Sequence, residues 1–220
     1  MVRAKLSIVF ALLAVLMLTG SQCVLVATSG SSGDADKPSD EQQSNLVVVI
    51  RSGRFVDAPV QGLGYRSGTL AGVTGPNGEF EYLSGEAVQF HVGDLMLGRA
   101  VPAKALVTPV DLVADGSMDT PGVVNISRLL QSLDRVPGDD RITIPAEVGA
   151  AAVRSNAALF AAIEHIDFQD SSAFDNSAAQ LVATLTHDYP FTVTLIDAQT
   201  ARTHLFRSLA AVGLVPAATD

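Results

Sequence analysis

Residues 72–94 decide the fold, and they read GVTGPNGEFEYLSGEAVQFHVGD. Apolar and polar side chains alternate over 79–82 and again over 88–92, a period of two that indicates two half-buried strands. The pair Asn77-Gly78 stands before the first of them and tolerates positive φ. We therefore expect a small β domain with a tight hairpin at Asn77-Gly78.

Further strands are predicted on both sides of this stretch. Residues 46–50, LVVVI, form a continuous apolar run of mostly β-branched residues, which is typical of a buried strand. Weaker strand patterns occupy 62–66, 95–98 and 107–112, separated by glycine-rich turns. Strands at this spacing indicate a sandwich or a partial barrel.

The last third of the chain has helical periodicity. Thr120 before Pro121 predicts a helix start with a capping hydroxyl. Apolar residues then recur at the i, i+3, i+4 and i+7 positions of one helix face. These residues are Ile126, Leu129, Leu130 and Leu133. We expect Arg128 and Gln131 on the other side of this helix.

Three more helices are predicted after the first. A short extended piece at 142–144 precedes Pro145, which starts a helix, and residues 150–163 are rich in alanine, the best helix former. The remaining helix boundaries are predicted at Asp175 or Ser177, Asp197 and Gly213. Four short helices of this kind can close over one face or end of the β domain.

The N-terminal residues have the pattern of an export signal. Arg3 and Lys5 precede an apolar run over 6–18, and small residues follow at 19–21. The run is shorter than the roughly 20 residues that a membrane-spanning helix needs. The alternative is an uncleaved membrane anchor, because residues 24–27 extend the apolar stretch.

The only cysteine, Cys23, directly follows the predicted signal peptide, 1–22. This is the place where a bacterial lipoprotein carries its acylated cysteine, and residues 23–45 resemble a flexible tether behind it. Cleavage by ordinary signal peptidase near Ser21 or Ala27 is the competing interpretation. Either way we expect an exported protein of the bacterial outer membrane, periplasm or cell surface, with membrane contact through the lipid in the first case.

The composition excludes several classes of activity. The 220 residues carry a net charge of −9, which argues against nucleic acid as a partner. A single cysteine excludes an internal disulfide, a cysteine-rich zinc site and a dithiol redox pair. The sequence contains no Gly-x-Ser-x-Gly, no His-Glu-x-x-His, no P-loop and no Gly-x-Gly-x-x-Gly motif opening a helix. We expect no cofactor, with calcium as the one alternative.

Five segments together resemble a known family: 62–65, 72–82, 85–94, 108–112 and 125–134. Their last two read Thr-Pro-x-Asp-Leu and Asn-Ile-x-Arg-Leu-Leu-Gln-x-Leu-Asp. The combination is similar to an uncharacterised family of bacterial secreted and lipoprotein modules, and to the prealbumin-like regulatory domains of carboxypeptidases. The resemblance implies a surface location and an Ig-like architecture, and it implies no particular reaction.

The strand and helix patterns and this resemblance lead to one fold prediction. We expect an α+β protein, with a small antiparallel Ig-like or prealbumin-like β-sandwich followed by a cluster of short α-helices. The β domain is placed at 46–114 and the helical region, packed on it, at 115–220.

The same resemblance raises the question of calcium. Family members often follow the Leu-Asp pair with a loop that resembles a calcium loop, and here Asp134, Asp139 and Asp140 stand in that position. An oxygen cage for Ca²⁺ needs six to eight ligands. Arg135 and Arg141 place positive charge in the loop, so pairing of the carboxylates with these arginines, or helix capping, is the other interpretation.

The densest ligand-like cluster is Glu164, His165 and Asp167, with Asp170 nearby. Histidine and carboxylate suit zinc or manganese. The alternative is a polar helix end, where a histidine interacts favourably with the helix dipole.

Two carboxylate or histidine pairs invite a catalytic interpretation. Glu79 and Glu81 share one strand face, as a paired-carboxylate site would require, and they also fit the outward face of any half-buried strand. His187 and Asp188 are adjacent, but sequence neighbours rarely point at each other, and a loop before Pro190 explains them.

The aromatic and remaining histidine residues allow two interpretations. A sugar-stacking surface or a packed core would use Tyr65, Phe80, Tyr82 and Phe90, and their alternation favours the core. We expect His91 to be exposed on its strand, and His204, which stands between apolar helix positions, to be packed and hydrogen-bonded.

Two classes of function remain. The first is a non-enzymatic exported envelope protein that acts as an interaction or adhesion module or stabilises a surface assembly, with an unidentified protein or surface as its partner. The second is a metal-dependent or carboxylate-based hydrolase, and an accessory domain for a secreted enzyme is a third possibility. A histidine and carboxylates from distant segments meeting in one pocket would favour the hydrolase.

Overall fold

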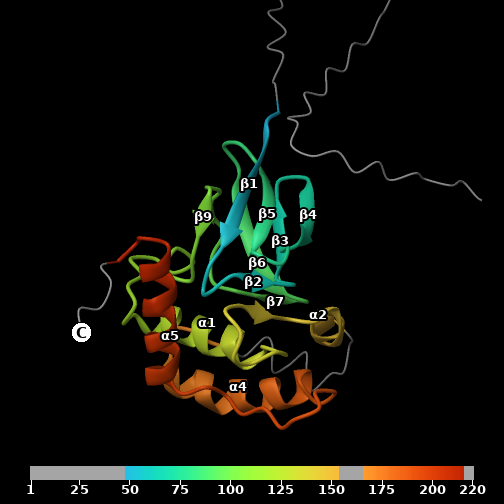
Figure 1. Ribbon diagram of the computed structural model, residues 1–220, viewed down its shortest axis with the longest axis vertical. Coiled ribbons are helices and arrows are strands. Elements are labelled where there is room, and N and C mark those ends of the chain that lie inside the picture. The colour runs from blue at the N-terminus through green and yellow to red at the C-terminus, as the bar shows by residue number, and fades with distance from the viewer. Residues whose placement is uncertain (1–47, 154–165, 216–220) are drawn as a thin grey trace, which may run out of the picture. The chain divides into compact units, whose positions relative to one another are not determined.

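The computed structural model describes residues 48–153 and 166–215 (Figure 1). The strands come first: β1 (Ile50–Phe55), β2 (Val60–Gln61), β3 (Gly64–Ser67), β4 (Leu70–Val73), β5 (Glu79–Leu83), β6 (Ala87–Val92), β7 (Leu95–Met96), β8 (Val101–Pro102) and β9 (Leu106–Val107). The helices follow, with one short strand among them: α1 (Pro121–Ser132), β10 (Ile142–Thr143), α2 (Ala146–Val153), α4 (Ser171–Leu185) and α5 (Ala198–Ala211). This content confirms the predicted α+β class.

Most strands belong to two sheets. One sheet has the order β5-β1-β9, with β1 antiparallel to β5 and parallel to β9. The other has the order β4-β3-β6-β7, antiparallel throughout, and β8 also pairs with β6. The parallel pair β2 and β10 stands apart from both. The described residues therefore contain mainly antiparallel sheets, while the specific Ig-like arrangement remains a prediction.

Aromatic side chains hold the two sheets together. The ring of Phe80 on β5 has its centroid 5.8 Å from that of Tyr65 on β3 and 5.1 Å from that of Phe90 on β6. Such tilted and edge-to-face pairs are favourable beyond the area they bury. Gly53 on β1 is opposite Phe80, and a Cβ there would lie 2.6 Å from the Phe80 ring. The glycine therefore makes room for the ring at the centre of this contact.

The prediction of a buried strand over 46–50 is wrong for the residues that the structure describes. The strand is β1, and Val48, Val49 and Ile50 before or at its start are 63%, 42% and 50% exposed. The reason is register: Ile50 is opposite Leu83, the last residue of β5, so the apolar run continues past the end of the sheet. Burial along β1 instead begins at Gly53.

The Asn77-Gly78 turn forms, but it does not make the predicted hairpin. Gly78 has a φ of +77° and its amide donates to the carbonyl of Gly75. The strands on either side, β4 and β5, belong to different sheets, because β5 pairs with β1. The buried Thr74 bonds to Val60 and Leu63 and directs the chain from one sheet to the other.

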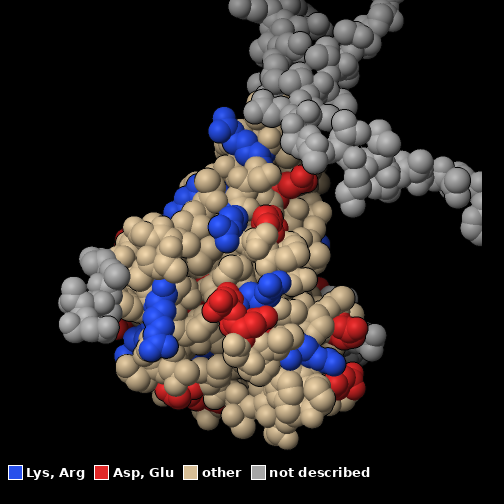
Figure 2. Space-filling view, in the orientation of Figure 1, with Lys and Arg blue, Asp and Glu red and all other residues tan. Residues whose placement is uncertain are grey.

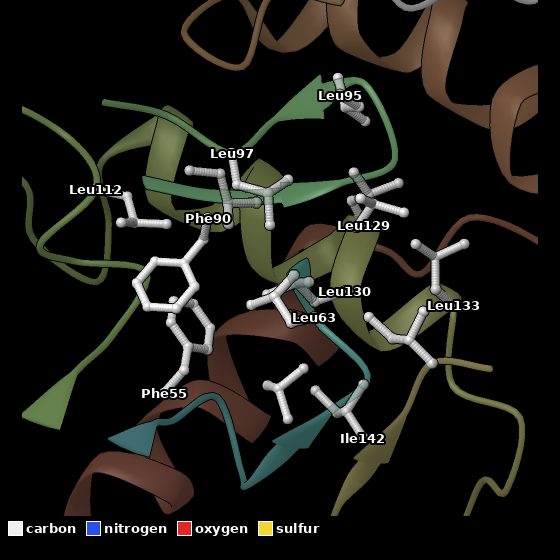
Figure 3. Packing of buried hydrophobic residues seen from close by; sticks show 14 of the residues in the cluster. Phe55, Leu63, Phe90, Leu95, Leu97, Leu112, Leu129, Leu130, Leu133 and Ile142 are labelled. Carbon is white, nitrogen blue, oxygen red and sulfur yellow. The ribbon is translucent and has the colours of Figure 1, made fainter. Parts of the chain in front are cut away.

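Helix α1 is the centre of the helical region, and every residue after Pro121 in it is buried. Its apolar face packs as predicted, and Figure 3 shows Leu130 in one cluster with Leu63 and Phe55 of the β part. Arg128 and Gln131, which are predicted on the other side of this helix, are buried as well, since each is only 8% exposed. Helices α4 and α5 cover the side of α1 that the sheets leave open.

The helix starts follow partly from the sequence. Thr120 precedes α1 as predicted, but its hydroxyl accepts from the amide of Ser117 and does not cap the helix. Asp170 caps α4, five residues before the predicted Asp175, by accepting from the amides of the first turn. Asp197 caps α5 as predicted, and Gly213, with a φ of +74°, follows its end.

The helical region and the β part share one hydrophobic core. Strand β10 lies within the helical region and pairs with β2, with Ile142 opposite Val60. Helix α2 begins directly after Pro145 as predicted, whereas the continuation of the predicted 150–163 helix lies outside the described residues. Figure 1 shows the helices gathered at one end of the sheets. Within the described ranges, no helix is both long and apolar enough to cross a membrane.

Candidate functional site

A buried carboxylate brings three distant segments together. Asp57 follows β1 in a tight turn and is fully buried, next to Ala58, whose φ is +56°. Gln131 of α1 places its side-chain nitrogen 3.3 and 3.2 Å from the two Asp57 oxygens, and the same nitrogen donates to the carbonyl of Ala201 at 3.2 Å. From α5, Nδ1 of His204 lies 3.2 Å from Oδ1 of Asp57. One carboxylate thereby joins the β part, α1 and α5.

The electrostatics of this cluster favour a charged histidine. The hydrogen bond with Asp57 raises the pKa of His204, against the opposing effect of its partial burial. Burial also raises the pKa of Asp134, whose charge lies near enough to favour protonated His204. The His204 side chain is 38% exposed, so its ring connects a buried carboxylate with solvent. A histidine that is oriented by a carboxylate and reaches solvent has the arrangement of a general acid or base.

A second polar cluster is built around Arg128. Its Nε donates to the carbonyl of Ile196 at 2.7 Å, and its terminal nitrogen contacts Asn125 at 3.1 Å and Asp175 of α4 at 2.6 Å. The guanidinium also lies over the ring of Phe174, 5.3 Å from its centroid. A buried arginine with this many partners fixes the positions of α4 and of the segment before α5 relative to α1.

The end of α1 continues the same pattern. The hydroxyl of Ser132 donates to the carbonyl of Arg128 and accepts from the amide of Ile196. The Tyr189 hydroxyl donates to the carbonyl of Leu133 at 2.6 Å, and burial raises the pKa of Tyr189. The polar residues of the 125–134 motif, apart from Ser127, therefore bind other parts of the same chain.

The part of the predicted metal cluster that lies in the described residues does not form a metal site. Glu164 and His165 lie outside the described residues, and Asp167 accepts from the amide of Gln169. In the ranges that the structure describes, no three histidine, cysteine, aspartate or glutamate side chains are placed to share a metal ion.

The predicted calcium loop has other contacts. Asp134 accepts from the amides of Val136 and Thr143 at 3.1 and 2.9 Å. Asp139 pairs with Arg141 at 3.6 Å, and Asp140 is exposed. The arginine-pairing interpretation is confirmed for Asp139, and Asp134 stabilises the chain reversal before β10.

Of the two pairs considered for catalysis, both among the described residues, Glu79 and Glu81 make no contact with each other that forms a site, whereas His187 and Asp188 form an ion pair. Glu79 accepts from the side chain and the amide of Asn77, which lowers the pKa of Glu79, while Glu81 is exposed. The expectation that His187 and Asp188 do not meet is wrong, since His187 Nε2 lies 2.9 Å from Oδ1 of Asp188. Both side chains are about 70% exposed, where such a pair is worth little.

Two adjacent hollows share His187 and Tyr189 in their walls. The first has a volume of about 320 Å³ and is also lined by Arg135, Glu147, Val148, Ala151, Leu185 and Asp188. The second, of about 310 Å³, is also lined by Ala183, Thr186, Pro190, Phe191, Thr192 and Val193. Neither includes His204 or Asp57, so the buried carboxylate cluster does not open into these hollows.

The remaining predictions concern aromatic and histidine residues. The four aromatic residues considered for sugar stacking are at most 7% exposed and form the core, as their alternation indicates. His204 is hydrogen-bonded as predicted, to Asp57, but its side chain is 38% exposed and therefore only partly packed. His91 is only partly exposed, because its ring lies over Gly64 and its Nδ1 is 2.8 Å from the carbonyl of Gly93.

Sequence reasoning missed Asp57. Its signal was present in the segment Phe55-Val56-Asp57-Ala58-Pro59, where a lone carboxylate is surrounded by apolar residues and a buried charge needs a partner. Its partners come from 74 and 147 residues further along the chain, and local pattern does not reach that far.

The comparisons with known proteins add no relative. No protein-family model matches the sequence, and no match was found among curated proteins or among solved structures. The resemblance to bacterial lipoprotein modules therefore remains a prediction. Cys23 and the export signal lie outside the described residues.

Proposed function

We propose that the protein is an exported envelope protein, anchored through an acylated Cys23, that works as an interaction or adhesion module or stabilises a surface assembly. The pattern of the first 22 residues and the tether after Cys23 support export and anchoring. An Ig-like arrangement of the two packed sheets is part of the proposal. It would present strands and loops to a partner on a stable scaffold.

One observation supports this function best: most of the large apolar side chains that are exposed in the described ranges belong to the β part. Five of the eight large apolar residues that are exposed in the described ranges belong to it, namely Val48, Val49, Ile50, Val73 and Met96. The buried side-chain polar atoms of the described ranges, by contrast, bind the chain's own backbone and side chains, with Ser127 Oγ and Arg202 Nε as the exceptions. In the view of Figure 2, acidic and basic side chains are interspersed, so that face offers no single-sign surface. Apolar contact on the β part is therefore the proposed mode of recognition.

Site-specific photo-crosslinking in intact envelopes tests the interaction. A photoreactive residue at Val49, Val73 or Met96 should give a discrete adduct that saturates with expression level, because these side chains face solvent on the β part. The matched control carries the photoreactive residue at Ala179, which is exposed on α4, and this position should give no adduct. Equal adducts at all four positions, or none at any, would contradict the proposal.

Mass spectrometry of the mature N-terminus tests the anchor. We expect a diacylglyceryl or triacylated Cys23 in the membrane fraction, and a shift of the protein to the soluble fraction in Cys23→Ser. A free N-terminus downstream of Cys23 would show ordinary secretion instead.

The hydrolase alternative is favoured by one observation, the meeting of Asp57 and His204 from segments 147 residues apart. If His204 is a general base, His204→Gln should abolish turnover of a chromogenic ester or peptide while the circular dichroism spectrum stays unchanged. Wild-type protein without turnover, across a panel of such substrates, would count against this function.

A further inference from the structure

The outermost strand of the larger sheet, β4, has an open edge. In the described part of the chain β4 pairs with β3 alone, with Ser67 opposite Leu70 and Gly64 opposite Val73. Figure 1 shows β4 at the margin of the sheet. Its residues Ala71, Gly72 and Val73 are all exposed, Val73 to 67%.

The backbone groups that face outward can be identified from the turn. Gly68 and Thr69 form a two-residue loop, with Gly68 at a φ of +55°, so the flanking residues Ser67 and Leu70 form a hydrogen-bonded pair. Bonded and non-bonded pairs alternate along an antiparallel ladder. The N–H and C=O groups of Ala71 and Val73 therefore point away from β3, toward the open edge.

This edge lacks the usual protection. Natural edge strands are blocked by charge, proline, a bulge or very short length. In the described sheets, β7 and β9 have two residues each, and β5 carries Glu79 and Glu81. β4 reads Leu-Ala-Gly-Val, in regular register with β3 and without a charge or a proline.

Charge indicates what kind of strand fits. On the outer face Ala71 stands beside Arg66 of β3, which is exposed and forms no ion pair with any described residue. The small side chain of Ala71 lets the Arg66 guanidinium extend across β4. A strand added at this edge would therefore gain from a carboxylate next to Ala71.

We propose that β4 accepts an extended segment of a partner protein as an additional strand, with small or apolar side chains and one carboxylate beside Arg66. Main-chain hydrogen bonds to Ala71 and Val73 would provide affinity, and the carboxylate would provide specificity. This inference rests on the proposed interaction function. A second copy fits less well, because Leu70–Val73 offers no carboxylate to Arg66.

A designed peptide tests the edge on the full mature protein. The probe alternates threonine and valine and has one central glutamate; a glutamine version and a version N-methylated at alternate residues are its controls. Binding of the glutamate peptide should slow hydrogen exchange at the amides of Ala71 and Val73. The N-methylated peptide should not bind, because it lacks the N–H donors of an added strand. The glutamine peptide should bind about threefold more weakly, because an ion pair with the exposed Arg66 is worth little.

Protein variants separate the edge from general surface effects. Val73→Pro removes an N–H that points toward the open edge and makes no hydrogen bond to β3. This variant should bind the peptide at least about tenfold more weakly. Ala179→Lys, at an exposed position of α4 outside the sheets, should change binding less than about twofold. Arg66→Glu should reverse the preference, so that a peptide with a central lysine binds better than the glutamate peptide.

Three outcomes would overturn the inference. The first is equal binding by wild type and Val73→Pro. The second is a homodimer in sedimentation that Val73→Pro dissociates, which would assign the edge to a second copy. The third is envelope crosslinking from Val49 or Met96 with none from Val73, which would contradict binding at this edge and leave the interaction function standing. No adduct at any of the three positions would contradict both the interaction function and binding at the edge.

Discussion

The β part and the helical part are stabilised in different ways. Between the sheets, contact is made by rings, with Phe80 at the centre between Tyr65 and Phe90. Around α1, apolar packing is supplemented by buried polar side chains, of which Arg128 and Gln131 reach the backbone of segments far along the chain.

The difference shows what each kind of contact specifies. The burial of aromatic rings is stabilising in many relative orientations, and such a core tolerates small adjustments in packing. A buried guanidinium or amide is stable only when particular acceptors stand at hydrogen-bond distance. The polar contacts of α1 therefore fix the positions of α4, α5 and the segment between them, which regular secondary structure alone would leave undetermined.

The largest effect is expected from Phe80→Ala. Removing a fully buried ring should lower the free energy of unfolding by about 4 kcal/mol, because both the transfer energy and the packing of neighbouring rings are lost. Urea denaturation measures it. Met96→Ala, at an exposed position, should stay within about 0.5 kcal/mol, and a similar loss in both variants would contradict a core centred on Phe80.

Arg128→Met should cost about 3 kcal/mol, since it keeps the apolar stem but leaves the Ile196 carbonyl and the Asn125 side chain without their donor. Arg202→Met is the matched control. Its Nε lies 3.9 Å from an exposed Asp119, and the change should cost less than about 1 kcal/mol. If Arg128→Met is as stable as wild type, apolar packing alone positions α4 and α5.

Two serines of α1 should respond in opposite directions. Ser127 is buried and its hydroxyl has no hydrogen-bond partner within the described part, so Ser127→Ala should stabilise the protein by about 1 kcal/mol. Ser132 uses its hydroxyl twice, and Ser132→Ala should destabilise it by about the same amount. Thermal unfolding of both variants measures the difference, and equal signs would refute the assignment.

The smallest effect concerns pH. Because Asp57 raises the pKa of His204, this pair stabilises the fold below the unfolded pKa of histidine, about 6.5, and the contribution disappears as pH rises through the folded pKa. The histidine is more than one third exposed, so the loss should be well under 1 kcal/mol, roughly that of a surface pair. Unfolding free energies between pH 6 and 8 should decline less in His204→Gln than in wild type. An unchanged decline would show that another group is responsible.

The sequence by itself determined the features that depend on local pattern. Alternation over 79–92 produced β5 and β6, and the apolar spacing produced the buried face of α1. The Asp197 cap also followed from its neighbours, because its carboxylate bonds to amides two and three residues away. These interactions are short in sequence, so propensity and periodicity describe them fully.

Only the tertiary structure decided which polar residues are buried and which apolar ones are exposed. Arg128 and Gln131 fit the outer side of an amphipathic helix until α4 and α5 cover it, and Asp57 gains its partners only when α1 and α5 arrive. The run at 48–50 looks like a core strand, yet β5 ends opposite Ile50. The physical reason is the same in each case: the free energy of burying a group depends on its partners, and these come from distant parts of the chain.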